Sequence, residues 1–442
     1  FRRVLFRSMS NQPEINVDHA NDLDSQDPLR AFKDEFVITD PSVCYLDGNS
    51  LGRLPKKTVT EVNSFLMNEW GPELVDGWSH WIDQAQPAGD LLARAVLGAE
   101  AGQTLVCDTT SVNFYQLCVA AIKARPGRKT VIIDSSNFPT DRYVLAGIAE
   151  SMGLNLVTLD TDGSGGPGAV KIESEFERVT ADALAPHLND DVALVTLQAI
   201  NYRSGARQNL KEITDLVRNH GGLVVWDCSH AAGSIQLDFE KNGVDLAVGC
   251  TYKYGNSGPG SPAWLFVSNR IQKELRVPIQ GWFAQDLQFE MGPDFDPADT
   301  IRRFQIASPS IIGIRGVEVA FEMIERAGIA NIELKAAKGT DLMISLFHQW
   351  LEPLGFELAT PKEHFLRGGH IIITHPDAKQ IAYAMRKLSN VIPDYRVPNA
   401  IRLAISPLAT SYREVFDGFE RLRDLVVSGE HLGLAQDGNR VT

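Results

Sequence analysis

Short apolar runs alternate with amphipathic stretches through the middle of the chain. Seven such runs occur, at 105–107, 131–134, 154–159, 192–197, 223–226, 246–249 and 263–267. Apolar runs of this length indicate buried strands, and strands separated by helices are typical of a mostly parallel sheet covered by helices. We therefore predict an α/β fold, with a large domain over residues 60–304 built on a mostly parallel seven-stranded sheet.

The pattern changes after about residue 305. Helical periodicity dominates 311–350 and returns at 378–388 and 412–427, while short apolar runs at 370–373 and 401–405 indicate strands. These elements predict a smaller α+β domain over 305–442. We expect residues 9–59 to pack with this smaller domain, and residues 1–8 to be a non-native extension ahead of Met9.

Composition and net charge argue against several classes of function. The net charge of -14 argues against a nucleic-acid footprint and against a polybasic membrane surface, and favours a small-molecule substrate. No apolar run reaches the ~20 residues of a membrane span. The five cysteines lie far apart without Cys-x-x-Cys spacing, so neither a metal site nor a disulfide framework is indicated. A reducing cytoplasm fits this composition best.

An acid and a lysine follow two of the predicted strands. Asp227 follows the run 223–226, and Lys253 lies in a turn rich in glycine. This pairing suits pyridoxal 5'-phosphate, because a lysine forms a Schiff base with its aldehyde and an ionised carboxylate keeps its pyridine nitrogen protonated. The alternatives are a solvated loop lysine and an aspartate that caps a helix. His230 is a candidate for orienting the cofactor ring or Asp227. The alternative is a histidine that only packs in the core.

Two other strand ends carry candidate cofactor contacts. Thr110 and Ser111 open a predicted helix, where free N–H groups and hydroxyls suit a phosphate, although simple helix capping explains them equally well. Phe138 offers an aromatic face and Asp141 a nearby carboxylate. The Gly-x-Gly-x-x-Gly pattern at 163–168 is better interpreted as a surface turn, because its proline and last glycine would occupy the start of the required helix.

The chain resembles the kynureninase family, a group of fold-type-I pyridoxal phosphate enzymes in the class-V aminotransferase superfamily. The resemblance runs from about Tyr45 to Val427. The segments that carry it are 45–52, 110–113, 138–141, 227–233, 252–254, 258–260, 281–283, 367–370, 401–402 and 407–408. The resemblance implies a fold-type-I architecture and the cofactor pyridoxal 5'-phosphate. It also implies a homodimer with shared active sites.

The resemblance implies roles for individual residues. Lys253 is then the Schiff-base lysine and Asp227 the partner of the pyridine nitrogen. Tyr252 is the implied proton donor, and Arg402 the group that binds the substrate carboxylate. The further implied cofactor contacts are Thr110, Ser111, Phe138, Tyr252 and Trp282. Asp141, His230 and Ser308 are further candidates for the cofactor, and Ser50 and His80 for the substrate, although His80 and Ser308 could equally be ordinary packing. Trp282 and Ser308 are expected to reach the active site of the neighbouring subunit.

The implied reaction is hydrolysis of L-kynurenine, or of 3-hydroxykynurenine, to an anthranilate and L-alanine in tryptophan catabolism. Three places depart from the family pattern: Ala284-Gln285, Ala307-Ser308 and Ala409. These departures favour, as an alternative, a related lyase or transaminase that acts on a different amino acid. A catalytically silent cofactor-binding protein is a second alternative. Cysteine desulfuration is disfavoured because no cysteine follows Cys250.

Overall fold

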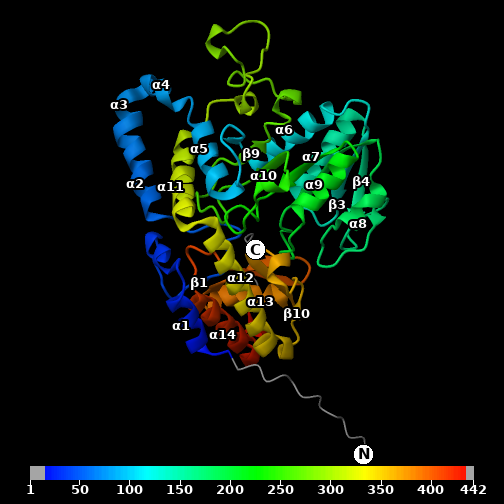
Figure 1. Cartoon of the computed structure of the whole chain (residues 1–442). Helices are drawn as coiled ribbons and strands as arrows, with labels where there is room; N and C mark the ends of the chain where they lie inside the picture. Colours follow the sequence, from blue (N-terminus) through cyan, green and yellow to red (C-terminus); the bar gives the residue numbers. More distant parts are fainter. Residues whose placement is uncertain (1–14, 435–442) are drawn as a thin grey trace, which may run out of the picture.

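A computed structural model describes residues 15–434 of the chain (Figure 1). The expected extension at 1–8 lies outside these described residues. The α-helices are α1 Val17–Ser25, α2 Lys56–Ser64, α3 Gly71–Glu73, α4 Trp78–Trp81, α5 Ala85–Leu92, α6 Thr110–Lys123, α7 Pro139–Met152, α8 Ala181–Leu184, α9 Leu210–Asn219, α10 Phe239–Asn242, α11 Ile311–Ala327, α12 Ile329–Leu346, α13 Ala378–Leu388 and α14 Tyr412–Ser428. In the part of the chain that the structure describes, no helix is both long and apolar enough to cross a membrane.

The large sheet contains β2 Thr104–Val106, β3 Thr130–Asp134, β4 Asn155–Asp160, β5 Val170–Lys171, β6 Val192–Gln198, β7 Leu223–Asp227, β8 Leu246–Gly249 and β9 Trp264–Val267. Its strand order is β2-β9-β8-β7-β6-β3-β4-β5. Only β9 runs antiparallel to its two neighbours, and the remaining pairs are parallel. The predicted α/β fold with a mostly parallel sheet is therefore confirmed.

The seven predicted apolar runs correspond to seven of these strands. The eighth strand, β5, was not predicted, because its two residues are exposed and carry no apolar run. This short strand joins the edge of the sheet beside β4. The segment 163–168 forms the turn between β4 and β5, with Gly163, Gly166 and Gly168 at positive φ. No helix follows it, which agrees with its interpretation as a turn.

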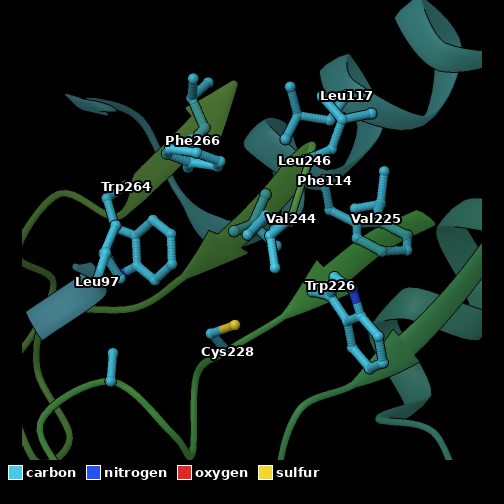
Figure 2. Packing of buried hydrophobic residues seen from close by; sticks show 14 of the residues in the cluster. Leu97, Phe114, Leu117, Val225, Trp226, Cys228, Val244, Leu246, Trp264 and Phe266 are labelled. Atoms are coloured by element: carbon cyan, nitrogen blue, oxygen red, sulfur yellow. The ribbon is translucent and has the colours of Figure 1, made fainter. Parts of the chain in front are cut away.

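A buried apolar cluster lies between the large sheet and its helices (Figure 2). Phe114 and Leu117 of α6 lie beside Val225 of β7 and Leu246 of β8, whereas Trp226 of β7 points to the other side of its strand. The indole N–H of Trp226 donates to Thr214 Oγ1 on α9 at 3.0 Å, so burial leaves that polar atom satisfied. This packing holds β7 and β8 rigidly, and the loops after these two strands form part of the candidate site.

A second buried cluster surrounds a smaller antiparallel sheet. That sheet has the order β10-β11-β14-β13, with β10 Glu357–Leu358, β11 His370–Thr374, β13 Asp394–Arg396 and β14 Ala400–Ala404. A separate parallel pair joins β1 Cys44–Tyr45 to β12 Val391–Ile392. In Figure 1 these elements lie below the large sheet.

The two clusters are linked by helices near the predicted domain boundary. Apolar residues along α11 belong to the first cluster, as does Ile332 near the start of α12. The C-terminal part of α12 belongs to the second cluster through Leu342, Met343, Ile344 and Leu346. The predicted helix over 311–350 breaks at Gly328, whose φ of 76° differs from that of a helix. At the N-terminal end, α1 contacts α14. The boundaries at 59 and 304 stay predictions.

Candidate active site

Four neighbouring parallel strands end at one edge of the large sheet. These are β3, β6, β7 and β8. The loops that follow them carry Phe138, Tyr202, His230 and Lys253, in that order. Ligands of open α/β sheets bind outside the carboxyl ends of the strands. A ligand-binding site is therefore expected at this edge of the large sheet.

Lys253 contacts side chains from two other loops. Its Nζ lies 2.8 Å from Nε2 of His230, and 5.8 Å from the centroid of the Phe138 ring. Burial lowers the pKa of Lys253, because an ammonium loses hydration in this environment. A lysine with a lowered pKa is the form that nucleophilic and proton-transfer chemistry requires.

Asp227 ends β7 with its side chain buried. Its Oδ1 accepts a hydrogen bond from Ser229 N at 2.9 Å. Asp141, in the first turn of α7, is close enough for the charge of Asp227 to act on it. Burial, together with that charge, raises the pKa of Asp141 well above its ordinary range. The Asp141 carboxyl group is therefore expected to keep its proton.

These two carboxyl groups fit the cofactor expected from the sequence. Oδ2 of Asp141 accepts no hydrogen bond from a donor among the described residues, and the Asp141 carboxyl lies within hydrogen-bond reach of Asp227. Two neighbouring buried carboxyl groups without a cation form an environment that favours a positively charged ligand group. A protonated pyridine nitrogen would supply the positive partner that Asp227 needs. The part of the site that contains Asp227 and Asp141 thus suits the pyridine ring of pyridoxal 5'-phosphate.

His230 joins the large domain to the smaller sheet. Its ring centroid lies 5.4 Å from that of His370 on β11, with the planes at 61°. Burial is the main reason why the pKa of each histidine falls well below its ordinary range, so both rings are neutral. Nδ1 of His230 and both ring nitrogens of His370 have no hydrogen-bond partner in the described chain.

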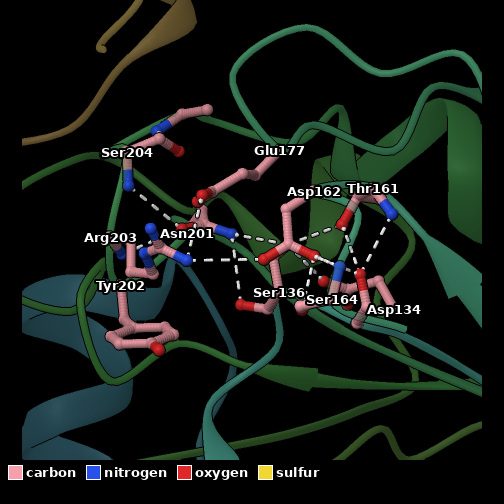
Figure 3. A network of polar contacts seen from close by, with 12 residues as sticks. Asp134, Ser136, Thr161, Asp162, Ser164, Glu177, Asn201, Tyr202, Arg203 and Ser204 are labelled. Atoms are coloured by element: carbon pink, nitrogen blue, oxygen red, sulfur yellow. Dashed lines mark hydrogen bonds and ion pairs between the residues drawn. The ribbon is translucent and has the colours of Figure 1, made fainter. Parts of the chain in front are cut away.

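A polar network ties the loop after β3 to the loop after β6 (Figure 3). Ser136 Oγ donates to Asp134 Oδ2 at 2.8 Å and accepts from Asn201 Nδ2 at 3.1 Å. Arg203 lies 3.4 Å from Asp162 and 3.6 Å from Glu177.

The network fixes the loops that present Phe138 and Tyr202. The rings of these two residues meet edge to face, with centroids 5.3 Å apart. Because each ring is held by its own loop, the network determines the position of this aromatic pair beside Lys253.

The start of α6 has the features expected of a phosphate site. Thr109 caps the helix, and its Oγ1 accepts from Val112 N at 3.3 Å. Asn113 anchors the turn through Nδ2, which donates to the Cys107 carbonyl at 2.9 Å. The first N–H groups of a helix have no acceptor within it and carry a partial positive charge. Thr110 and Ser111 are the first two residues of this helix, as predicted.

Arg402 on β14 is buried beside the aromatic pair. Its Nη1 donates to the Tyr202 carbonyl, and its Nη2 donates to Ser50 Oγ at 2.9 Å. The same Nη2 lies 2.6 Å from Oδ2 of Asp394. Arg402 Nε is buried without a hydrogen-bond partner among the described residues. The structure therefore brings Ser50 and Arg402 together, and leaves a donor of the guanidinium group for a ligand.

Three predicted residues lie apart from this group. His80 is exposed on α4 and pairs with Glu73 at 2.7 Å. Trp282 is 46% exposed and contacts Phe283. Ser308 is exposed. No hydrogen bond or ring contact joins these three to the Lys253 group within residues 15–434.

The departures from the family pattern at 284–285 lie at the base of a projecting arm, the segment 285–297 (top of Figure 1). Gln285 Oε1 accepts from Asp296 N at 2.7 Å, and Ala298 N donates to the Ala284 carbonyl at 2.9 Å. Arg302 donates to the carbonyls of Phe283 and Gln285, at 2.9 Å each. The side chain of Gln285 therefore joins the two ends of the arm.

The other two departures differ in exposure. Ala307 and Ser308 are exposed, and Ala409 is buried in the first apolar cluster.

Several residues of this site were not predicted from the sequence. They are Tyr202, His370, Asp394 and Arg396, whose Nε lies 2.8 Å from Oδ2 of Asp394. His370 closes the segment 367–370, which carried part of the resemblance, and Asp394 lies eight residues before Arg402. Both come from the smaller sheet, and nothing in a local pattern shows that this sheet faces the carboxyl ends of the large one.

Two families match the chain. Residues 45–365 match aminotransferase class V, and residues 332–422 match the kynureninase C-terminal domain. A kynureninase of Pseudomonas fluorescens is 32% identical over 412 residues, covering 91% of this chain and 94% of the relative. A kynureninase of Deinococcus radiodurans is 32% identical with the same two coverages.

Solved structures share the fold. A cysteine desulfurase from Thermococcus onnurineus NA1 has a TM-score of 0.72 at 16% identity, covering 92% of this chain and 98% of that chain. A cystine C–S lyase in complex with cysteine persulfide has a TM-score of 0.72 at 18% identity, covering 87% and 98%. At such identities the likeness concerns the fold alone.

Proposed function

We propose, since the chain belongs to the kynureninase family of class-V aminotransferases, that it hydrolyses L-kynurenine or 3-hydroxykynurenine. The products are anthranilate or 3-hydroxyanthranilate, and L-alanine. The observation that carries this proposal is that Asp227 at the end of β7 and Arg402 of the smaller sheet both lie close enough to Lys253 for their charges to act on it. These residues supply a nucleophilic amine, a counter-charge for a cationic ring and a carboxylate binder.

The cofactor is pyridoxal 5'-phosphate, and the site has a group for each of its parts. Lys253 is the residue that attaches it, Asp227 with Asp141 receives its ring nitrogen, and Phe138 offers a ring face. The start of α6 at Thr110 receives its phosphate. When bound, the cofactor supplies an electron sink for the carbons of the amino acid.

Proton transfer is assigned to Lys253 and Tyr252. Burial lowers the pKa of Lys253, which increases the fraction present as a free amine able to accept a proton. Burial raises the pKa of Tyr252 above its ordinary range, so its hydroxyl keeps the proton that it would donate to a carbon. Neutral His230 lies against Lys253 Nζ and orients the amine.

Arg402 binds the substrate carboxylate. Its planar fork suits a two-point contact with a carboxylate, and its buried Nε is without a partner among the described residues. Ser50, which already accepts from Nη2, holds the guanidinium in place. A carboxylate fixed here orients the bond to be broken relative to the cofactor.

The test is a product balance. Purified holoprotein is incubated with L-kynurenine, and anthranilate and alanine are quantified together with the keto acids that a transaminase would form. We expect anthranilate and alanine in equal amounts. Release of keto acid, or turnover of other amino acids in place of kynurenine, would favour the related lyase or transaminase. No turnover of any amino acid would favour a silent cofactor-binding protein.

We further propose a homodimer with shared active sites. Trp282 is 46% exposed, Ser308 is exposed, and the tip of the arm at 285–297 carries Phe289 at 70% exposure. A large exposed apolar group on a projecting arm is typical of an interface. In the test, the purified variants Lys253→Ala and Trp282→Ala are mixed so that their subunits exchange. Each variant alone is expected to have impaired activity. Shared sites predict recovery of up to about a quarter of wild-type activity in the mixture, and no recovery would contradict sharing.

A role in tryptophan catabolism in the cytoplasm completes the proposal. Support for the compartment comes from the five cysteines, which are all buried and unpaired. Free thiols of this kind persist in a reducing environment. Fractionation of the native host cells, followed by immunodetection, would test the location, and accumulation of kynurenine on deletion of the gene would test the role.

A further inference from the structure

A single buried carboxylate bridges two arginines beside the candidate site. Asp394 Oδ2 lies 2.6 Å from Arg402 Nη2 and 2.8 Å from Arg396 Nε. Asp394 and Arg402 are each 1% exposed. The pairing follows from the sheet, because Asp394 on β13 is opposite Arg402 on β14 in the antiparallel register. Arg396 lies two residues further along β13 and therefore on the same face.

Arg396 extends from this bridge toward Lys253. Its Cζ lies 5.8 Å from the centroid of the Tyr202 ring, and that ring meets Phe138 edge to face. Burial and the charge of Arg402 lower the pKa of Lys253 and of His230, and the charge of Arg396 adds a smaller effect in the same direction. Among the described residues, Nη1 and Nη2 of Arg396 form no hydrogen bond or ion pair.

The charges of this bridge sum to one positive charge. Arg402 and Asp394 alone would form a neutral buried pair, which would attract an incoming carboxylate weakly. Arg396 adds the charge that makes the group cationic. The nearby pair Asp47 and Arg386, 3.7 Å apart, does not reverse this sum, because one member is acidic and the other basic.

Substrate binding also affects the ion pair of Asp394. If Arg402 turns its donors to a substrate carboxylate, Asp394 loses its shorter ion pair. A buried carboxylate without a cation is strongly unfavourable. Arg396 is already 2.8 Å from the same oxygen, so Asp394 keeps a cation throughout the exchange.

We propose that Arg396 is a positioning residue for the substrate carboxylate, which acts through Asp394 by keeping that acid paired while Arg402 binds the substrate. The inference rests on the proposed function in one respect, the assignment of Arg402 as the carboxylate binder. It does not require kynurenine to be the substrate. A purely structural role for Arg396 in β13 would instead affect every ligand equally.

The experiment compares an acid with its amide. The absorbance of the bound cofactor is titrated with L-alanine and, separately, with L-alaninamide, which has the amine but no carboxylate. The variants are Arg396→Gln and Arg396→Met, which remove the charge, and Arg396→Lys, which keeps it. The matched control is Arg423→Met, since Arg423 is also 28% exposed and also pairs with an acid, Asp424.

We expect the Gln and Met variants to bind L-alanine about tenfold more weakly, with binding of L-alaninamide changed less than about twofold. Arg396→Lys should restore most of the affinity for L-alanine, and Arg423→Met should match wild type. Circular dichroism checks folding, and one folded charge-removing variant is sufficient. Equal weakening for acid and amide, or no weakening, would overturn the inference.

The outcomes separate this inference from the proposed function. An acid preference that disappears in Arg402→Met but survives in Arg396→Gln would overturn the inference alone. A wild-type protein without any preference for the acid would overturn the role of Arg402 and the inference with it. A preference that depends on Arg396, in a protein that does not cleave kynurenine, would leave the inference standing and overturn the proposed substrate.

Discussion

Gly52 holds the N-terminal segment against the loop that carries Lys253. Its N–H donates to the Tyr252 carbonyl at 2.8 Å. A Cβ added at Gly52 would lie 2.4 Å from the Lys253 carbonyl oxygen and 2.7 Å from Cα of Asn256. Both are backbone atoms, so no side-chain rotation relieves the overlap. Gly52→Ala is therefore a direct way to displace Lys253 without changing it.

The size of the effect follows from these distances. Ordinary contact begins at 3.4 Å, so the loop must move by about 1 Å. Overpacking of this kind costs about 1–3 kcal/mol of stability. A displacement of about 1 Å at a reacting group lowers turnover by about 100-fold. We expect both losses in Gly52→Ala.

The assay combines kynurenine turnover, absorbance titration with pyridoxal phosphate and urea unfolding. Gly147→Ala is the control, because Gly147 lies in α7 with no atom within 4 Å of the added Cβ. That change should stabilise the helix by about 1 kcal/mol and leave turnover unchanged. Wild-type turnover and cofactor affinity in Gly52→Ala would contradict a role for Gly52 in placing Lys253.

Two further predictions concern buried charges. Burial raises the pKa of Glu177 from 4.5 to about 7. Between these two pH values the native protein keeps a proton on Glu177 that the unfolded chain releases. The stabilisation that comes from this proton is therefore lost as the pH rises from about 4.5 to about 7. The thermal stability of Glu177→Gln relative to wild type should therefore increase from pH 5 to pH 8, and a constant difference would contradict the assignment. Asp27→Ala should cost about 3–5 kcal/mol in urea unfolding, because it leaves Lys335, 3% exposed and 2.7 Å from Asp27, without its partner. The exposed pair of Lys57 and Glu322 is the comparison, and Glu322→Ala should cost less than about 1 kcal/mol.

Periodicity predicted the large sheet well, because its central strands are buried on both faces and so appear as continuous apolar runs. The same property explains the failure at β5, which is short and exposed. The helix over 311–350 was correct in kind, but its break at Gly328 depends on a backbone angle that the apolar pattern does not report.

The part of the site that follows strand ends was predictable for the same reason. Asp227, Phe138 and Lys253 each follow an apolar run, and parallel strands bring their carboxyl ends together. The contributions of His370 and Asp394 were not predictable, because they depend on how the smaller sheet packs against the large one. Only the three-dimensional structure shows that contact.

Hydrolysis of kynurenine at this site is proposed to depend on Lys253. The most direct measurement follows anthranilate fluorescence after L-kynurenine is added to the protein with pyridoxal phosphate, for wild type and for Lys253→Ala. We expect an absorbance of the bound cofactor and anthranilate release in wild type, and the loss of anthranilate release in the variant. Anthranilate release that persists in Lys253→Ala, or its absence in wild type that binds the cofactor, would contradict the proposed role of Lys253.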